Sequence, residues 1–114
     1  MIRTSADMKK ETRSDMRGGT GNVQITHLLE AGEMMGKARL CAVLSIPAGG
    51  SIGSHVHDPD AEIYIIISGQ GRLDDNGVDR VVKTGDVVFT GGGESHAIYN
   101  TGAEAMELYA IVIE

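Results

Sequence analysis

The stretch from Gly49 to Gly69, GGSIGSHVHDPDAEIYIIISG, decides how the rest of the chain is interpreted. His55 and His57 are one residue apart, so in an extended strand both side chains point to the same face and can bind one ion together. The residues Asp58–Asp60 favour a turn, and an apolar strand follows whose first inward residue is predicted to be Glu62. This return predicts a carboxylate beside the two imidazoles.

A second glycine-rich stretch places another histidine in a similar setting. Gly85 and Asp86 form a predicted turn before a short apolar strand over residues 87–90, three glycines follow, and His96 and Asn100 come next. Three of the four histidines of the chain therefore fall within two strand pairs that glycines delimit. Histidine and glutamate at this spacing are the strongest functional signal in the sequence.

The two stretches resemble the two motifs of the cupin superfamily. The first motif, G-x5-H-x-H-x3,4-E-x6-G, is matched at every position from Gly49 to Gly69. The second, G-x5-P-x-G-x2-H-x3-N, is matched from Gly85 to Asn100, except that Gly91 stands where the family usually has proline. The resemblance covers residues 38 to 113 and implies a small antiparallel β-barrel of the cupin type, a double-stranded β-helix or jelly roll. It also implies one metal ion with four ligands, His55, His57, Glu62 and His96.

Composition independently favours an all-β fold. A chain of 114 residues is large enough for one core, and with no tryptophan and one phenylalanine that core must consist of aliphatic side chains. Sixteen glycines suit a fold with many tight turns better than a helical bundle, in which each interior glycine would cost about 1 kcal/mol. Asn76 and Gly77 predict a two-residue hairpin. Short turns between successive strands predict antiparallel sheets.

We expect two parts in the chain, an arm over residues 1–22 and the barrel over residues 23–114. The arm is polar, and its sequence suggests a short helix from Ser5 to Met16 that is either mobile or packed on a partner subunit. His27 lies outside both motifs and is interpreted as a structural or surface residue.

The charge of the chain bounds its partners. A net charge of −6 argues against nucleic acid or an anionic membrane, since both require a basic surface. The expected ligand is a small molecule, which an open metal site in an apolar pocket favours. No leader segment and no long apolar stretch is evident, so the expected location is the cytoplasm. The many strand edges of the predicted fold favour a homodimer.

Three imidazoles and one carboxylate suit one divalent transition metal ion, and Mn, Fe, Co, Ni and Zn all remain open. Four protein ligands leave two positions free if the metal is octahedral. We expect an apolar wall around the site from Ile63, Ile65 or Ile66, Phe89 and Ile98. Tyr64 follows Glu62 by two residues and shares its face, so it is a candidate contact for a substrate or a bound water.

The open positions favour an enzyme that acts on a small oxygenated substrate, such as a keto or carboxylic acid, an enol, a phenol or a sugar. Related cupins include dioxygenases, decarboxylases, lyases and isomerases, so the resemblance fixes no single reaction. The alternative is a cupin that binds or senses a small molecule without turnover. No cluster of Arg or Lys lies near the motifs in the sequence, which disfavours phosphorylated sugars.

Overall fold

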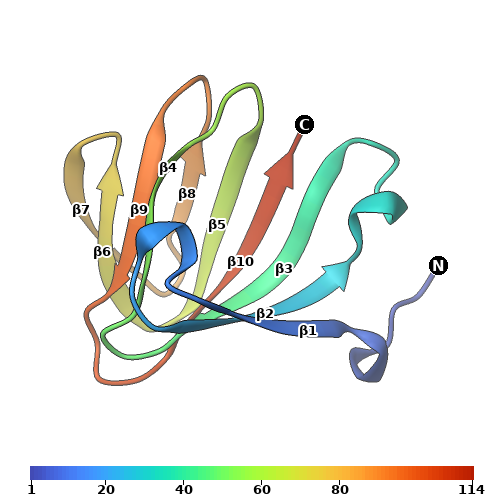
Figure 1. Ribbon diagram of the computed structural model, residues 1–114, viewed down its shortest axis with the longest axis horizontal. Coiled ribbons are helices and arrows are strands. Elements are labelled where there is room, and N and C mark those ends of the chain that lie inside the picture. Colours follow the sequence, from blue (N-terminus) through green and yellow to red (C-terminus); the bar gives the residue numbers. More distant parts are fainter.

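The structure is a computed structural model that describes all residues from 1 to 114. The chain forms ten β-strands and three short 3-10 helices (Figure 1). In chain order the elements are η1 (Ser5–Asp7), β1 (Lys9–Ser14), η2 (Met16–Gly18), β2 (Asn22–Leu29), η3 (Ala31–Glu33), β3 (Ala38–Ile46), β4 (Ser51–Val56), β5 (Ala61–Ser68), β6 (Gln70–Asp75), β7 (Val78–Lys83), β8 (Val87–Thr90), β9 (Ser95–Asn100) and β10 (Met106–Ile113). None of the helices has the length and apolar character that crossing a membrane requires.

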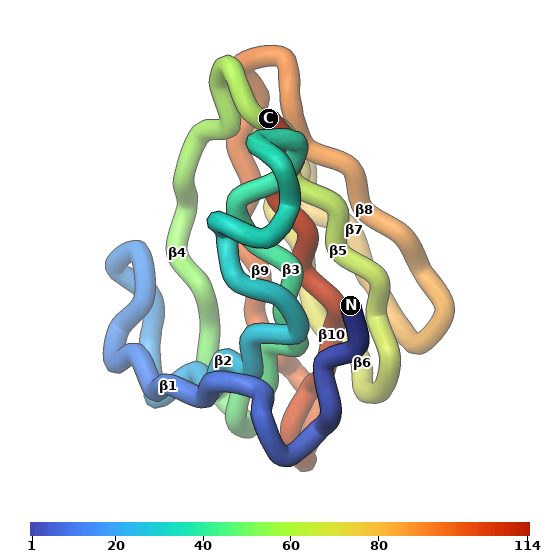
Figure 2. The backbone as a smooth tube through the Cα atoms, turned by 90° about the vertical axis from the view of Figure 1, so that its right-hand side faces the viewer, coloured from blue at the N-terminus to red at the C-terminus, as the bar shows by residue number.

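The strands form two antiparallel sheets that pack as layers (Figures 1 and 2). The larger sheet has the strand order β1-β2-β3-β10-β5-β8, and the smaller sheet has the order β4-β9-β6-β7. Every hydrogen-bonded pair of strands is antiparallel. From β3 to β6 the chain alternates between the two sheets, which is a jelly-roll arrangement. The all-β, antiparallel jelly roll is confirmed, although backbone hydrogen bonds do not close the two sheets into one continuous barrel.

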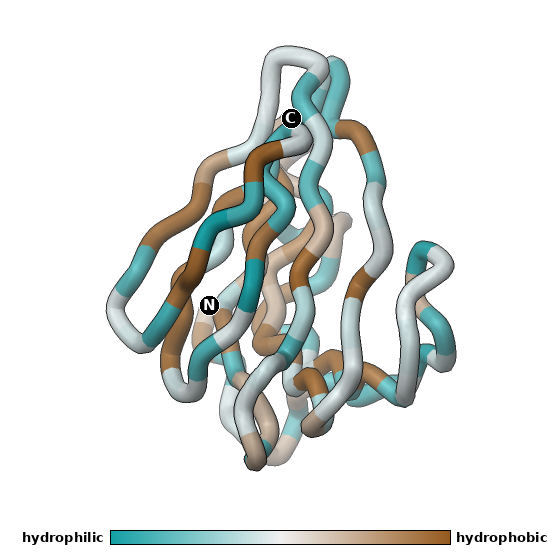
Figure 3. Tube along the Cα trace, turned by 90° about the vertical axis from the view of Figure 1, so that its left-hand side faces the viewer, coloured by the Kyte–Doolittle hydropathy of each residue, from teal (hydrophilic) through white to brown (hydrophobic).

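The core lies between the two sheets because apolar side chains alternate along the strands. In β10 every second residue from Met106 to Val112 is buried. Figure 3 shows apolar and polar segments alternating along several strands of the fold. Leu44 of the larger sheet and Leu73 and Ile98 of the smaller sheet belong to the same cluster. Each fully buried aliphatic side chain stabilises the fold by about 1.5–3 kcal/mol.

The predicted hairpin at Asn76 and Gly77 is confirmed. Their φ angles of 50° and 91° are the positive values that this tight turn needs between β6 and β7. The carboxylate of Asp74 accepts a hydrogen bond of 2.7 Å from the backbone N–H of Gly77. The turn is therefore fixed by local sequence.

The predicted helix from Ser5 to Met16 is wrong. Most of this segment is β1, which pairs antiparallel with β2 so that Lys9 lies opposite His27. A helix this short has little stability of its own, whereas the edge of β2 offers partners for the backbone N–H and C=O groups of β1. The division of the chain into an arm over residues 1–22 and a barrel over residues 23–114 stays a prediction.

Candidate metal centre

The four motif residues come together between the two sheets. His55 lies on β4, His57 directly follows β4, and His96 lies on β9 opposite His55 in the strand register. Glu62 reaches them from β5 in the other sheet. One ligand atom of each residue lies within 4.8 Å of those of the other three. The cluster could hold one metal ion, and the convergence that the two stretches predicted is present.

The polar atoms of the cluster lie within hydrogen-bond or ion-pair distance of one another. Oε1 of Glu62 lies 3.0 Å from Nε2 of His57, 3.0 Å from Nε2 of His96 and 3.5 Å from Nε2 of His55. The Nε2 atoms of His55 and His96 are 3.0 Å apart. Four donor atoms therefore face one point, with the single carboxylate oxygen shared among three imidazoles.

The donor atoms of the cluster fit a metal ion. Nε2 of His57 is buried and makes no hydrogen bond, although Oε1 of Glu62 lies 3.0 Å away. A buried polar atom of this kind normally makes one. A divalent cation would satisfy this atom together with the other donors. Imidazole nitrogen and carboxylate oxygen are ligands that Mn, Fe, Co, Ni and Zn accept.

The opposite nitrogen of each imidazole is held by a neighbouring group. Nδ1 of His55 donates to the carbonyl oxygen of Gly53 over 2.8 Å, which requires the proton to be on Nδ1 and leaves the lone pair on Nε2. Nδ1 of His57 lies 3.1 Å from the carboxylate of Asp60, and Nδ1 of His96 lies 2.8 Å from the hydroxyl of Thr90. Such contacts orient imidazole ligands toward a metal.

Asp60 links the cluster to the outer part of the chain. Its buried carboxylate contacts Nδ1 of His57 and also forms an ion pair with Arg39. Burial alone would raise the pKa of Asp60, but hydrogen bonds from His57 and Arg39 outweigh burial and lower it. The carboxylate is therefore ionised at neutral pH and accepts a hydrogen bond from the Nδ1–H group of His57. Arg39 also lies 3.4 Å from the carboxylate of Glu114.

Electrostatics keep Glu62 charged. Burial acts to raise its pKa, but close contacts with the imidazoles of His55 and His96 and the electrostatic influence of His96 and His57 lower it to about 2. Burial is also the main reason why the pKa of His96 is lowered, with Glu62 opposing that shift. A negative carboxylate beside a neutral imidazole is the protonation state that metal binding requires.

Tyr64 forms one wall of the cluster. Its ring stacks on that of His96 with centroids 4.8 Å apart and an interplanar angle of 10°. The side chain is buried, and burial together with the charge of Glu62 raises the pKa of Tyr64 well above its ordinary value. The hydroxyl therefore keeps its proton at any physiological pH.

A pocket of about 240 Å³ opens onto the cluster. Its apolar lining consists of Met16, Leu40, Leu44, Tyr64 and Val112. Its charged and polar lining consists of Arg13, Arg17, His27, Arg39, His55, His57 and Glu62. The pocket is therefore basic at its outer part, in a chain whose net charge is −6.

The expected apolar wall is wrong, because none of Ile63, Ile65, Ile66, Phe89 and Ile98 lines the pocket. Phe89 does not line the pocket, because the neighbouring Thr90 points inward to His96 and strand alternation turns Phe89 outward. Ile98 is buried in the core and does not line the pocket either. No cluster of basic residues lies near the motifs in the sequence, but the fold brings Arg13, Arg17 and Arg39 to the pocket that contains motif residues.

Sequence reasoning missed several groups at the site. Asp60 and Thr90 lie within the motif stretches. The turn before Glu62 could have indicated Asp60, and the alternation of β8 could have indicated Thr90. Arg17 and His27 come from the region before residue 30, and no local pattern in the sequence indicates that they line the pocket. Their placement follows from the pairing of β1, β2 and β3.

Comparison with known proteins agrees with the geometry. The Cupin_2 family, described as a cupin domain, matches residues 42–112. A Thermotoga maritima protein named "Oxalate-binding protein" is 46% identical over 113 residues, covering 99% of this chain and 93% of the relative. A crystal structure from the same organism, described as a predicted oxalate decarboxylase, has 46% identity and a TM-score of 0.94, with 99% of this chain and 98% of that chain covered.

A more distant structure shares the fold alone. The polyketide cyclase RemF from Streptomyces resistomycificus is 19% identical, with a TM-score of 0.79 over 99% of this chain and 79% of that chain. The family match extends over most of β3 to β10 and includes all four clustered residues. With the match to the relative along nearly its whole length, this shows that the chain belongs to the cupin family.

Proposed function

We propose that this cupin binds one divalent transition metal ion through His55, His57, Glu62 and His96, and with it binds and transforms a small dicarboxylate of the oxalate class. The convergence of three Nε2 atoms and one carboxylate oxygen at the base of a basic pocket carries the proposal. The name of the Thermotoga maritima relative and the description of the crystal structure from that organism support the choice of ligand.

A metal at these donors would supply a Lewis acid that holds and polarises a substrate oxygen. The protein supplies the other requirements. The bonds to Gly53, Asp60 and Thr90 keep the three imidazoles oriented, so little reorganisation accompanies loading. The low pKa of Glu62 keeps a negative charge in the ligand set.

The walls of the pocket suit a small acid. Leu40, Leu44 and Val112 exclude water from one side, which strengthens electrostatic interactions inside the pocket. Tyr64 keeps its hydroxyl proton and is therefore a hydrogen-bond donor to a carboxylate oxygen of the substrate. A pocket of about 240 Å³ is below the usual size of drug-binding sites and fits a ligand of few atoms.

One observation favours the alternative of binding without turnover. The only carboxylate that lines the pocket is Glu62, which belongs to the cluster. No separate carboxylate therefore stands ready as a general base, although such a group is common in acid–base catalysis. The relative named for oxalate binding is consistent with either reading.

Metal loading followed by calorimetry and product analysis tests both readings. Protein purified without chelator is analysed for metals, stripped, and reloaded separately with Mn, Fe, Co, Ni or Zn. Oxalate is expected to bind to a loaded form and not to the stripped form. Binding with product identifies an enzyme, and binding without product in every metal form identifies a binding protein.

A matched control separates the cluster from general charge. Glu62→Gln is expected to abolish metal binding, whereas Glu94→Gln makes the same change at an exposed turn and is expected to leave it intact. Oxalate binding that is equally strong in the stripped and loaded forms would contradict the proposed function.

We also propose that the chain forms a homodimer through the outer face of β7 and β8. These are edge strands of the two sheets, and each presents unpaired backbone groups. Val81, Val87 and Phe89 are exposed there. Arg80 lies in the same hollow as Asp75 and has no ion pair within the chain, so a second copy can supply one across a twofold axis.

A further inference from the structure

We propose that Arg17 binds the second carboxylate of the ligand and thereby makes the site selective for dianions over monoanions. This inference deepens the proposed function and depends on it. Arg17 is carried by η2, far from both histidine motifs in the sequence. It lines the same pocket as His55, His57 and Glu62.

Arg17 differs from the other two arginines of the pocket in being unpaired. Arg13 forms an ion pair of 2.7 Å with Glu11, and Arg39 forms ion pairs with Asp60 and Glu114. No carboxylate lies within ion-pair distance of Arg17. Its guanidinium therefore keeps its donors free for a ligand, and a guanidinium matches a carboxylate with two parallel hydrogen bonds.

The backbone that carries Arg17 is docked closely against β4. A Cβ atom at Gly53 would overlap the carbonyl oxygen of Arg17, and a Cβ atom at Gly19 would overlap the carbonyl oxygen of Ser51. The N–H of Ser51 also donates to the carbonyl oxygen of Thr20 over 2.8 Å. Two glycines thus allow η2 to lie directly beside the strand that carries His55, and Figure 2 shows this loop alongside β4.

Arg17 itself has an unusual conformation. Its φ and ψ angles are 55° and 31°, and Asp15 has a similar left-handed conformation with a φ angle of 51°. A left-handed residue other than glycine costs roughly 1–2 kcal/mol. Such conformations persist where the surrounding structure fixes them, and they cluster at ligand sites. Here two hydrogen bonds between Thr20 and Ser51 hold the end of the loop on β4.

Charge and size explain why a dianion would be selected. The cluster contributes one negative carboxylate, so a bound divalent metal would leave a net positive centre for one carboxylate of the ligand. The free guanidinium of Arg17 provides a second positive group in a pocket of about 240 Å³. The charge of Arg17 also extends to Tyr64, where it acts to lower the pKa against burial and Glu62.

The experiment measures affinities for oxalate and for oxamate, its monoanionic amide, by calorimetry on metal-loaded protein. Arg17→Gln is expected to weaken oxalate binding by about tenfold or more and oxamate binding far less, because one charge-assisted interaction is lost. Arg17→Lys is expected to retain part of the selectivity. Metal content and melting temperature, measured on each variant, are expected to be unchanged.

Lys10→Gln is the matched control, since Lys10 is an exposed cation on β1 that does not line the pocket. It removes the same charge and is expected to leave the ratio of the two affinities unchanged. If Arg17→Gln and Lys10→Gln alter the ratio equally, the assignment of Arg17 is overturned while the proposed function stands. If the parent protein binds oxalate in no metal form, both are overturned.

Discussion

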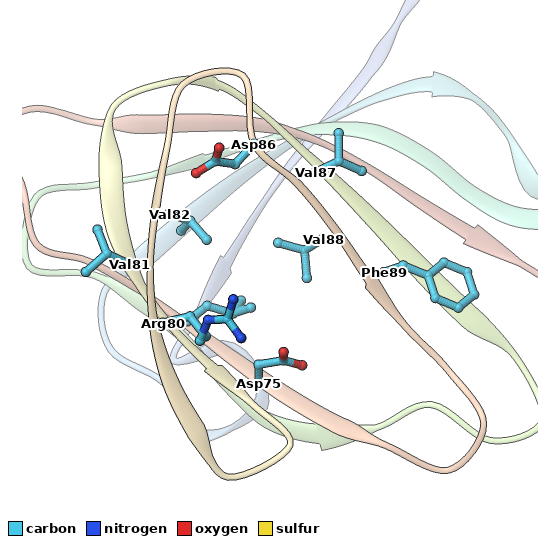
Figure 4. A pocket seen from close by; sticks show the side chains of 9 residues that line it. Asp75, Arg80, Val81, Val82, Asp86, Val87, Val88 and Phe89 are labelled. Carbon is cyan, nitrogen blue, oxygen red and sulfur yellow. The ribbon is translucent and has the colours of Figure 1, made fainter.

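The chain has three hollows, and the one at the histidine cluster is the smallest. The hollow between β7 and β8 measures about 330 Å³, against about 240 Å³ for the pocket at the cluster. Val81 and Phe89 in the larger hollow are 83% and 61% exposed, and the side chains labelled in Figure 4 line an open surface. By contrast, His57 and Glu62 are 3% and 4% exposed. Volume therefore does not identify the functional site.

What distinguishes the smaller pocket is the arrangement of its polar atoms. Each imidazole is held at Nδ1 by a neighbouring group, and one buried Nε2 makes no hydrogen bond. The larger hollow has an arginine and two carboxylates, Asp75 and Asp86, with no such convergence. Buried polar groups that face one point carry chemistry, whereas exposed apolar side chains at sheet edges favour association.

The sharpest test of this contrast removes a ligand. His96→Ala is expected to reduce metal affinity by more than the roughly 10–100-fold that loss of an outer partner causes, because a donor is removed and the stacking partner of Tyr64 is lost. Phe89→Ala deletes an aromatic ring in the other hollow and is expected to leave metal content unchanged. Elemental analysis after identical purification measures both, and equal metal content in the two variants would refute the site.

Much of the site could be predicted because its residues lie close in sequence. The period of two along a strand is enough to bring His55 and His57 to one face, and the turn before Glu62 returns the chain to them. Resemblance to the cupin motifs added His96, which lies on β9 opposite His55. Short-range geometry and a known motif were therefore enough to predict the four-residue cluster and the jelly-roll fold.

The remaining features depend on pairing between distant strands. Arg17 lines the pocket because η2, which joins the paired strands β1 and β2, docks against β4, and a weak local helix preference gave no indication of that arrangement. Phe89 was expected inside because it is apolar, but the register of β8 is set by Thr90 facing His96. Hydrophobicity alone does not determine which residues of a short strand face the interior.

Acid is expected to destabilise the fold through the histidine cluster. The pKa of His96 is below its ordinary value, so the unfolded chain binds more protons as pH falls below about 6.5, and stability falls with it. The pKa of Glu62 is about 2 against an ordinary 4.5, so a further loss of about 3 kcal/mol is expected as pH falls from 4.5 toward 2.

Urea unfolding of metal-free protein at several pH values measures this dependence. Maximal stability is expected above pH 6.5, where both contributions are fully present. Glu94→Gln, at an exposed turn, is expected to leave the profile unchanged. Stability that rises as the pH is lowered from 7 to 4 would contradict the electrostatics of the cluster.

A smaller effect is expected from the outer partner of His57. Asp60→Asn removes the charge that holds Nδ1 of His57 and leaves Arg39 without its buried partner. Metal affinity is expected to fall by about 10–100-fold while the four ligands remain. Competition with a chelator of known affinity measures the change. Asp58→Asn makes the same substitution at an exposed position in the same turn, and an equal loss there would show that Asp60 has no special role.

The smallest effect on the metal site is expected from the other hollow. Val81→Glu places a charge on the proposed dimer surface and is expected to convert a dimer into a monomer in light scattering, with metal affinity unchanged. The free energy of unfolding of the monomer is expected to change by no more than about 0.5 kcal/mol, since Val81 is a surface residue. Ile2→Glu introduces the same charge at an exposed residue outside the hollow and is expected to leave the dimer intact. A monomeric parent protein, or a Val81→Glu variant that stays dimeric, would show that this hollow is not a dimer interface. Of the two hollows compared, only the pocket at the histidine cluster would then have a proposed function.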